Sequence, residues 1–524
     1  MATIGEVNAD IPELVEKNEK PTLPIKLYFG VFFDGTSNNM VDQKTAKKYR
    51  ASSNKREEWE KDVRSSDGDS FNNGANQLKK QDDGINTAKY SNVAILHSLY
   101  QALSVEALKN ERNSAEVKVF NIYVEGAGTD AIYDGGIISK VYNWRGSVSG
   151  KGHSGVSQLV CKAVAMVKTR LGCYKGEESN TELHFDVFGF SRGATCARLF
   201  SYLAVRGKNE ILPCEEEFKD SMASDSFKSG ALQFLDKSLY KSVTVDFLGL
   251  FDTVSSIGAI SEKTYKNNVT DYGLFSPTLD GVKSTFQLCA MDEFRSHFAL
   301  TDIGKVIKGQ NAEVFIPGCH SDVGGGYVDN DDCSFRIEIG KQVGIHYYGK
   351  PDYERYSYPI DTINSEDGKT MKMGLDCFMK LGWIQDKSQY GEQFGVDSTS
   401  LEASIKRTVK CGYSNIPLTM MKKRTVLKTS RDAFREIPQD YSINELFSEW
   451  RDELLGYVSK SGRDWYYPGG SFSSDSYCRL RNYLHFSSKN SIGFTPSYKN
   501  GSICRYLYHG DENDSDQNYT VNAY

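Results

Sequence analysis

The segment that most limits what this chain can fold into is a serine flanked by glycines, Gly189-x-Ser191-x-Gly193. Residues 183–188 before it are rich in aromatic and apolar side chains, which predicts a buried strand. The residues after it place apolar side chains at helical spacing. A sharp strand-to-helix turn lifts the serine clear of the backbone, and the glycines remove Cβ atoms that would collide there. The segment predicts a nucleophile elbow.

Strand-like and helix-like segments alternate over a much longer part of the chain, which fixes the expected fold class. Alternation of this kind predicts a parallel sheet covered by helices on both faces. We therefore expect an α/β protein with an α/β-hydrolase-like, doubly wound, mostly parallel sheet and a second, insertion-rich C-terminal module. The expected strands cover residues 25–33, 117–124, 183–188, 243–251 and 312–316, and the expected helices cover residues 92–108, 155–171 and the segment after Ser191.

Candidate partners for Ser191 follow the ends of two of these strands. A serine hydroxyl is a weak nucleophile that needs a histidine base oriented by a carboxylate. His320 follows the strand at 312–316 and precedes three consecutive glycines. Asp252 ends the strand at 243–251. Because the carboxyl ends of parallel strands form sites in doubly wound sheets, we expect a catalytic triad of Ser191, Asp252 and His320.

Two alternatives remain open for the base and the acid. His485 lies between Leu484 and Phe486, a pattern more typical of a strand or core histidine. Asp322 lies two residues after His320, where it is poorly placed to reach the same imidazole.

An oxyanion hole is expected from backbone N–H groups, because such donors stabilise the charge that develops on an attacked carbonyl. The first candidate donor is the backbone N–H of Arg192, which lies at the start of the helix after the elbow. Gly35 and Thr36, in the Asp-Gly-Thr turn after the first strand, could supply a second donor. The alternative for that segment is a plain Asp-Gly turn.

Composition excludes several other classes of protein. The formal net charge is −6, and no Lys/Arg-rich run is present, so we expect no nucleic acid partner. The 11 cysteines show no C-x-x-C spacing, which argues against a zinc site and a disulfide framework. The proposed chemistry needs no cofactor and no metal. The first residues lack the pattern of a signal peptide, and no run of apolar residues is long enough to span a membrane.

The expected domains are a tail at residues 1–24, a catalytic domain at 25–334 and a second module at 335–524. Residues 41–86 read as a polar insertion in the catalytic domain. In the second module, the apolar side chains of residues 371–384 could lie on a membrane, although such a stripe is more often ordinary core. We also expect some segments of this module to return to the core.

Four motifs in order carry a resemblance to a known family. They are Phe32-Phe-Asp-Gly-Thr-Ser-Asn-Asn39, Gly189-Phe-Ser-Arg-Gly-Ala194, Phe251-Asp-Thr-Val254 and Pro317-Gly-Cys-His-Ser-Asp-Val-Gly-Gly-Gly-Tyr327. Together they resemble the catalytic domain of the first family of antibacterial type VI secretion lipase effectors. In that family the nucleophile, acid and base match Ser191, Asp252 and His320.

The resemblance implies phospholipase activity of A1 or A2 type on a membrane substrate. It implies synthesis in the bacterial cytoplasm and secretion into the periplasm of a target cell, where the protein would be peripheral at the membrane. It also implies a secretion-spike or adaptor partner and a cognate immunity protein, with membrane anchoring by parts of residues 335–524. Two other functions stay open: an esterase or thioesterase acting on soluble acyl substrates, and a non-enzymatic binding protein on a hydrolase scaffold.

Overall fold

The structure is a computed structural model of the 524-residue chain. It describes residues 23–36, 38, 40, 90–101, 115–127, 155–207, 235–256, 281–295, 297–304, 309–327, 331–339, 344–346, 357–359, 382–383, 390–391, 401–409, 412–471, 474–487, 497–499, 502–505 and 507–508. The tail before residue 23, the polar insertion at 41–86 and all but two residues of the 371–384 stripe therefore lie outside the described residues.

A seven-stranded sheet forms the centre of the molecule. Its strands are β1 (Ile25–Phe33), β2 (Glu116–Val124), β3 (Thr181–Phe190), β4 (Ser242–Phe251), β5 (Thr285–Ala290), β7 (Asn311–Ile316) and β13 (Gly462–Trp465). Their order is β13-β7-β5-β4-β3-β1-β2, and every neighbouring pair is parallel. The chain leaves β1 toward one edge and β3 toward the other, so the switch point of the sheet lies between these two strands.

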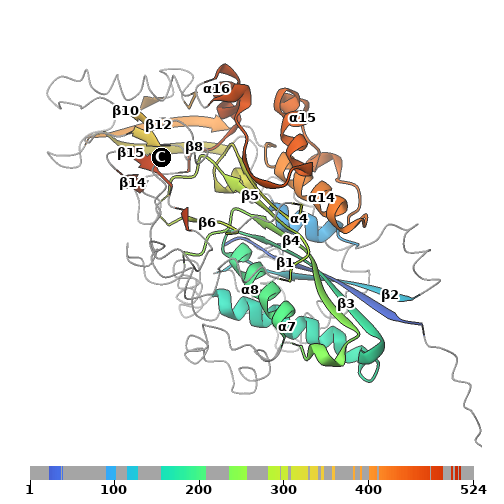
Figure 1. The fold of residues 1–524 in the computed structure, drawn as a ribbon. Helices are drawn as coiled ribbons and strands as arrows, with labels where there is room; N and C mark the ends of the chain where they lie inside the picture. The colour runs from blue at the N-terminus through green and yellow to red at the C-terminus, as the bar shows by residue number, and fades with distance from the viewer. Residues whose placement is uncertain are drawn as a thin grey trace, which may run out of the picture.

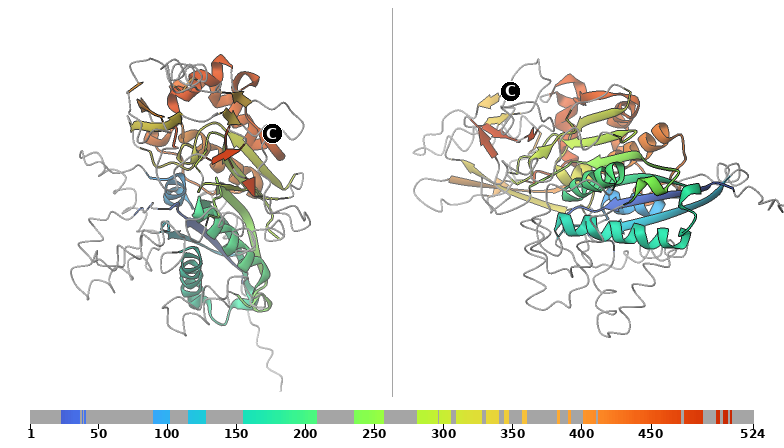
Figure 2. Two further views of the ribbon diagram at one scale, coloured as in Figure 1. Left: turned by 90° about the vertical axis from the view of Figure 1, so that its left-hand side faces the viewer. Right: turned by 60° about the horizontal axis from the view of Figure 1, so that its bottom comes forward.

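Helices cover both faces of the sheet because its strands are apolar on both sides. In β1, Phe29 and Val31 belong to one hydrophobic cluster, whereas Tyr28 and Phe32 belong to another. Helices α7 (Val156–Leu171) and α8 (Arg192–Arg206) pack on the first face, and α4 (Asn92–Leu99) and α14 (Asn415–Thr429) pack on the second. Figures 1 and 2 show these two layers on opposite sides of the strands.

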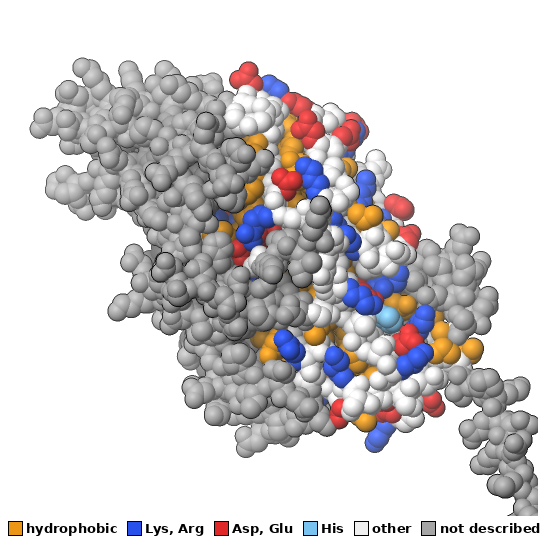
Figure 3. Space-filling model, in the orientation of Figure 1, with side chains coloured by type: hydrophobic (Ala, Val, Ile, Leu, Met, Phe, Trp, Pro, Cys, Tyr) orange, Lys and Arg blue, Asp and Glu red, His pale blue; other side chains and the backbone are white. Residues whose placement is uncertain are grey.

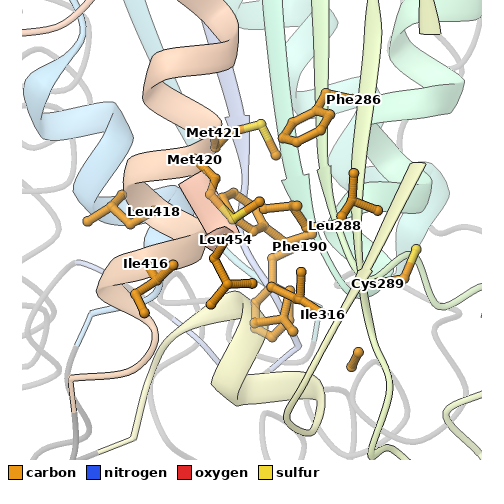
Figure 4. Close-up of a cluster of buried hydrophobic side chains, with 14 of the residues drawn as sticks. Phe190, Phe286, Leu288, Cys289, Ile316, Ile416, Leu418, Met420, Met421 and Leu454 are labelled. Carbon is orange, nitrogen blue, oxygen red and sulfur yellow. The ribbon is translucent and has the colours of Figure 1, made fainter. Parts of the chain in front are cut away.

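The second cluster joins the two halves of the chain. Figure 4 shows Met420 and Met421 of α14 directed toward Phe286 and Leu288 of β5. Phe190, the last residue of β3, lies in the same cluster, so this apolar core also supports the elbow. Helix α14 is followed by α15 (Ser448–Gly456) and α16 (Asp475–Leu480), and the short helix α12 (His320–Gly324) follows β7.

The remaining strands form small sheets. β10-β9-β15-β14 make one and β11-β12-β8 another, and β16 pairs with β6. Their bounds are β6 (Leu300–Thr301), β8 (Asp331–Ile339), β9 (Gly344–His346), β10 (Ser357–Pro359), β11 (Tyr390–Gly391), β12 (Leu401–Val409), β14 (Ser497–Lys499), β15 (Ser502–Cys504) and β16 (Leu507–Tyr508). Short 3₁₀ helices span Gly172–Tyr174, Glu178–Asn180, Lys237–Leu239, Gln439–Tyr441, Glu445–Phe447, Tyr457–Ser459, Pro468–Gly470 and Arg481–Tyr483.

The predicted fold class, an α/β protein with a mostly parallel sheet, is confirmed. Two strands of the sheet, β5 and β13, were not expected. β13 comes from the second half of the chain and forms one edge of the main sheet beside β7. The division into a catalytic domain ending at residue 334 and a separate module stays a prediction.

The described surface is mixed in character. On the face drawn in Figure 3, acidic and basic side chains are interspersed, with small groups of apolar atoms between them. None of the helices in the described part of the chain is both long and apolar enough to cross a membrane.

Candidate active site

Ser191 lies at a sharp turn between β3 and α8, as the flanking glycines predict. Its backbone has φ 60° and ψ −128°, a conformation that non-glycine residues rarely adopt. Holding a residue there costs on the order of 1–3 kcal/mol, so the surroundings must impose it. Two hydrogen bonds do so: the N–H of Ser191 donates to Phe251 O at 3.0 Å, and the N–H of Val254 donates to Ser191 O at 3.3 Å.

Close backbone packing explains both glycines of the elbow. A Cβ on Gly189 would lie 2.4 Å from Gly193 O, and a Cβ on Gly193 would lie 2.3 Å from Asp34 O. Each added carbon would meet backbone atoms, which cannot rotate away as a flexible side chain can. The start of α8 is therefore pressed against the carboxyl end of β1.

Asp252 and His320 meet at the same edge of the sheet. Asp252 follows β4 directly, is fully buried and has a φ of 47°. Its Oδ2 lies 2.6 Å from Nδ1 of His320, which begins α12 four residues after β7. The imidazole is packed against Phe190, with ring centroids 4.6 Å apart. The histidine thus contacts the residue that immediately precedes Ser191.

Charges around this pair set the proton affinities of both groups. Burial by itself raises the pKa of Asp252, but the Arg505 guanidinium and the hydrogen bonds from His320 and Arg505 hold that pKa well below its usual range. Burial lowers the pKa of His320, and the hydrogen bond and negative charge of Asp252 only partly offset this effect. The arrangement favours an ionised carboxylate beside a neutral imidazole.

Arg505 is part of this site, and sequence analysis missed it. Its two terminal nitrogens each lie 2.8 Å from one oxygen of Asp252. No motif surrounds Arg505, so the sequence carries no signal for this contact. Glu293 was also missed: its Oε2 accepts a hydrogen bond from the backbone N–H of His320 at 3.2 Å. Glu293 lies just beyond the end of β5, and recognising that strand would have drawn attention to it.

The two alternative residues, Asp322 and His485, pair with each other. Nδ1 of His485 lies 2.7 Å from Asp322 Oδ1. The other oxygen of Asp322 accepts hydrogen bonds from the backbone N–H groups of Cys319 and His485, each at 2.9 Å. Asp322 therefore stabilises the turn that contains His320. The imidazole of His320 contacts Asp252 instead.

The turn after β1 lies beside the elbow, but its donors are partly engaged. The N–H of Gly35 donates to Asp34 Oδ1 at 2.7 Å, and Thr36 Oγ1 accepts a hydrogen bond from Nε of Arg192 at 2.8 Å. Asp34 is buried and also accepts hydrogen bonds from Ser91 and Tyr123. Burial raises the pKa of Asp34 to about 6, although these three hydrogen bonds act in the opposite direction. An oxyanion hole at Arg192, Gly35 and Thr36 stays a prediction.

Within the described residues, no three His, Cys, Asp or Glu side chains are grouped so that they could hold a metal ion.

The sheet, the elbow and the His320–Asp252 contact together define the class of protein. It is an α/β protein with a serine elbow and a buried His–Asp pair at the carboxyl edge of one parallel sheet.

Comparison with known proteins identifies the family. The family model "T6SS, Phospholipase effector Tle1-like, catalytic domain" matches residues 29–341. The chain therefore belongs to this family of phospholipase effectors of the type VI secretion system, and the resemblance inferred from the four motifs is confirmed.

Two solved structures are similar to parts of the chain. One, described as the Tle1 effector bound to the VgrG spike from the Type 6 secretion system, is 21% identical, with a TM-score of 0.46, covering 90% of this chain and 86% of that chain. The other, an uncharacterized protein from Pseudomonas aeruginosa, is 16% identical, with a TM-score of 0.26, covering 58% of this chain and 42% of that chain. No curated protein matches the chain.

Proposed function

We propose that this effector is a phospholipase of A1 or A2 type that hydrolyses acyl ester bonds of membrane phospholipids through Ser191, Asp252 and His320. One observation carries the proposal: His320 Nδ1 lies 2.6 Å from Asp252 in a buried site, while the same imidazole packs against the residue before the elbow serine. A serine, a histidine and a carboxylate in this arrangement are the components of acyl transfer.

The proposed reaction has two steps. Neutral His320 takes the proton of the Ser191 hydroxyl through its second ring nitrogen, and the serine oxygen attacks the ester carbonyl. The ester C–O bond breaks as His320 returns the proton to the leaving lysolipid, which leaves an acyl-enzyme. Water, deprotonated by His320, then hydrolyses this acyl ester to release a fatty acid and restore Ser191. Asp252 stabilises the imidazolium that forms transiently in each step.

In this proposal, backbone N–H groups stabilise the oxyanion. The N–H of Arg192 lies at the start of α8, where the helix dipole also favours negative charge. The Gly35–Thr36 turn lies against the start of this helix, as the contact between Thr36 and Arg192 indicates. The Gly35 N–H would have to leave Asp34 before it could serve an oxyanion.

Delivery and targets complete the proposal. Assignment to a family of type VI secretion effectors supports delivery by that secretion system, with a secretion-spike or adaptor protein as partner. We further propose action in the periplasm of a target bacterium and a cognate immunity protein that protects the producer. We place membrane contact in parts of residues 335–524.

The test is the release of fatty acid and lysolipid from phosphatidylcholine vesicles by the wild-type chain, by Ser191→Ala and by Ser201→Ala. Ser201 is a matched control, because it is a buried serine on the same helix whose hydroxyl donates to Ala197 O. We expect release by the wild type and by Ser201→Ala and none by Ser191→Ala. Release by Ser191→Ala would refute the nucleophile assignment.

The same proteins assayed on a short-chain soluble ester separate the alternatives. Hydrolysis of the soluble ester without any vesicle hydrolysis would favour an esterase or thioesterase. Failure of a fluorophosphonate to label Ser191, together with silence on both substrates, would favour a non-enzymatic binding protein.

A further inference from the structure

Arg505 makes a bidentate contact with the carboxylate of the proposed triad. Each of its terminal nitrogens donates to a different oxygen of Asp252, both at 2.8 Å. Both side chains are buried, with exposed fractions of 4% for Arg505 and 0% for Asp252. Parallel bonds of this kind fix orientation as well as charge, because the guanidinium fork matches the carboxylate geometry.

The position of Arg505 is itself fixed by backbone contacts. Its Nε donates to Phe298 O at 2.9 Å, and one terminal nitrogen also donates to Ala290 O at 2.9 Å. Two residues later, Leu507 of β16 pairs with Leu300 of β6. The segment from the far end of the chain is therefore anchored on the elements that surround the site, and the guanidinium has little freedom to move.

The contacts of Arg505 reach His320 by two routes. The first passes through Asp252, whose Oδ2 is shared between the guanidinium and Nδ1 of the imidazole. The second passes through Phe298, whose ring lies edge-on to His320 with centroids 5.0 Å apart. Without the guanidinium, the buried carboxylate would keep His320 and the backbone N–H of Ala290, which donates to Asp252 Oδ1 at 2.8 Å, but it would lose the contact that neutralises its charge.

The other carboxylates near His320 each bind a basic side chain of their own. Glu293 accepts from its backbone N–H and is bound by Arg295 through two hydrogen bonds of 2.8 and 2.7 Å. Asp322, in the same turn, is bound by His485. Cys319 precedes His320 in the chain, and the buried Cys289 on β5 lies close enough to Asp252 and Arg505 for their charges to influence it. Among the described residues, Arg505 is the arginine that binds Asp252 directly.

We propose that Arg505 is a positioning residue of the triad: it holds Asp252 facing His320, and its charge weakens the hold of Asp252 on an imidazolium. This inference rests on the proposed triad. It predicts that a neutral side chain at position 505 strengthens the attraction between Asp252 and a protonated His320, so that the histidine loses its proton only at higher pH. Because catalysis needs a neutral imidazole, the acid limb of the pH–rate profile would then move to higher pH.

The experiment measures the pH dependence of kcat/KM for fatty acid release from phosphatidylcholine vesicles, whose headgroups do not titrate near neutral pH. The variants are Arg505→Gln, Arg505→Lys and the control Arg463→Gln. Arg463 is a matched control because it also comes from the second half of the chain and binds two buried carboxylates, those of Glu313 and Asp302.

For Arg505→Gln we expect kcat/KM at neutral pH to fall roughly 100-fold and the acid limb to move up by about one pH unit. For Arg505→Lys we expect an acid limb close to that of the wild type but a lower kcat, because an ammonium keeps the charge and loses the fork. Arg463→Gln is expected to leave the acid limb in place.

An acid limb that does not move in Arg505→Gln, or that moves equally in Arg463→Gln, would overturn the inference. If Arg505→Gln does not fold, a wild-type kcat in Arg505→Lys would overturn it instead. These outcomes differ from failure of the proposed function, which would appear as activity in Ser191→Ala.

Discussion

At the scale of single residues, the site depends on two strained positions that face each other across neighbouring strands. Ser191 and Asp252 both have a positive φ, at 60° and 47°. The two segments are tied together because Ser191 N–H donates to the carbonyl of Phe251. Asp252 is tied in turn to β5, since its N–H donates to Leu288 O at 2.7 Å. Such strain persists only where the surroundings determine the geometry several times over. Tight packing of glycines and buried carboxylates supplies that constraint here.

Gly193→Ala should disrupt the elbow, because the new Cβ would lie 2.3 Å from Asp34 O and 2.4 Å from Phe33 O. We expect a loss of at least about 2 kcal/mol in the free energy of unfolding, measured by denaturant titration, and loss of vesicle hydrolysis. Gly172→Ala is the control, since a Cβ there would have nothing within 4 Å. A Gly193→Ala protein as stable and active as the control would contradict this account of the elbow.

Asp34→Asn should change stability in a pH-dependent manner. The pKa of Asp34 in the folded protein is about 6, above its ordinary value of 3.8. Between these pH values the folded state keeps a proton that the unfolded state has released, so stability falls as pH rises through this window and levels off above it. Asparagine cannot ionise and avoids this loss. The difference in free energy of unfolding between variant and wild type should therefore shift in favour of the variant by roughly 2–3 kcal/mol from pH 4 to pH 8.

Unfolding of both proteins in urea at the two pH values checks the Asp34 prediction. An identical difference between variant and wild type at pH 4 and pH 8 would show that Asp34 does not bind a proton more tightly in the folded protein.

At the scale of elements, α14 joins the C-terminal half to the sheet. Its buried residues Leu418 and Met421 belong to the same hydrophobic cluster as Phe286 of β5 and Phe190 before the elbow (Figure 4). A helix of this kind is stabilised mainly by packing of its apolar side chains rather than by its intrinsic propensity. Loosening α14 should therefore loosen the support beneath the elbow.

Leu418→Ala and Leu427→Ala test this role with one substitution type on one helix. Leu418 is fully buried, whereas Leu427 is 51% exposed. We expect Leu418→Ala to lower the free energy of unfolding by about 2–5 kcal/mol and Leu427→Ala to change it by less than about 0.5 kcal/mol. Equal effects in thermal or chemical unfolding would mean that α14 is not packed on the sheet as described.

At the scale of the whole molecule, the part that matches the family model does not contain the complete core. The match ends at residue 341, but β13 forms an edge of the main sheet at residues 462–465, and Arg505 reaches the acid of the proposed triad. A fragment that stops at 341 would leave β7 as an open edge and expose the apolar face that α14 covers. Open strand edges and large apolar faces promote aggregation.

A fragment of residues 1–341 should therefore be insoluble or aggregated on size-exclusion chromatography, whereas the full chain should elute as a folded protein. Adding residues 342–524 as a separate chain should restore soluble protein, because the missing strand and helix would again be present. A soluble, active 1–341 fragment would instead support an autonomous catalytic domain ending near residue 334.

The features that the sequence alone determined are local ones. Alternating segments of apolar residues predicted the sheet and its helices, and glycines around Ser191 predicted the elbow, because periodicity and backbone freedom are properties of neighbouring residues. The positions of Asp252 and His320 after strands predicted where they lie, since parallel strands end at one edge. Tertiary structure alone decided the rest: the contact of Arg505 with Asp252 joins residues 253 positions apart, and β13 is a strand of four residues. Such contacts depend on how distant segments of the chain pack together, and a local sequence pattern cannot predict them.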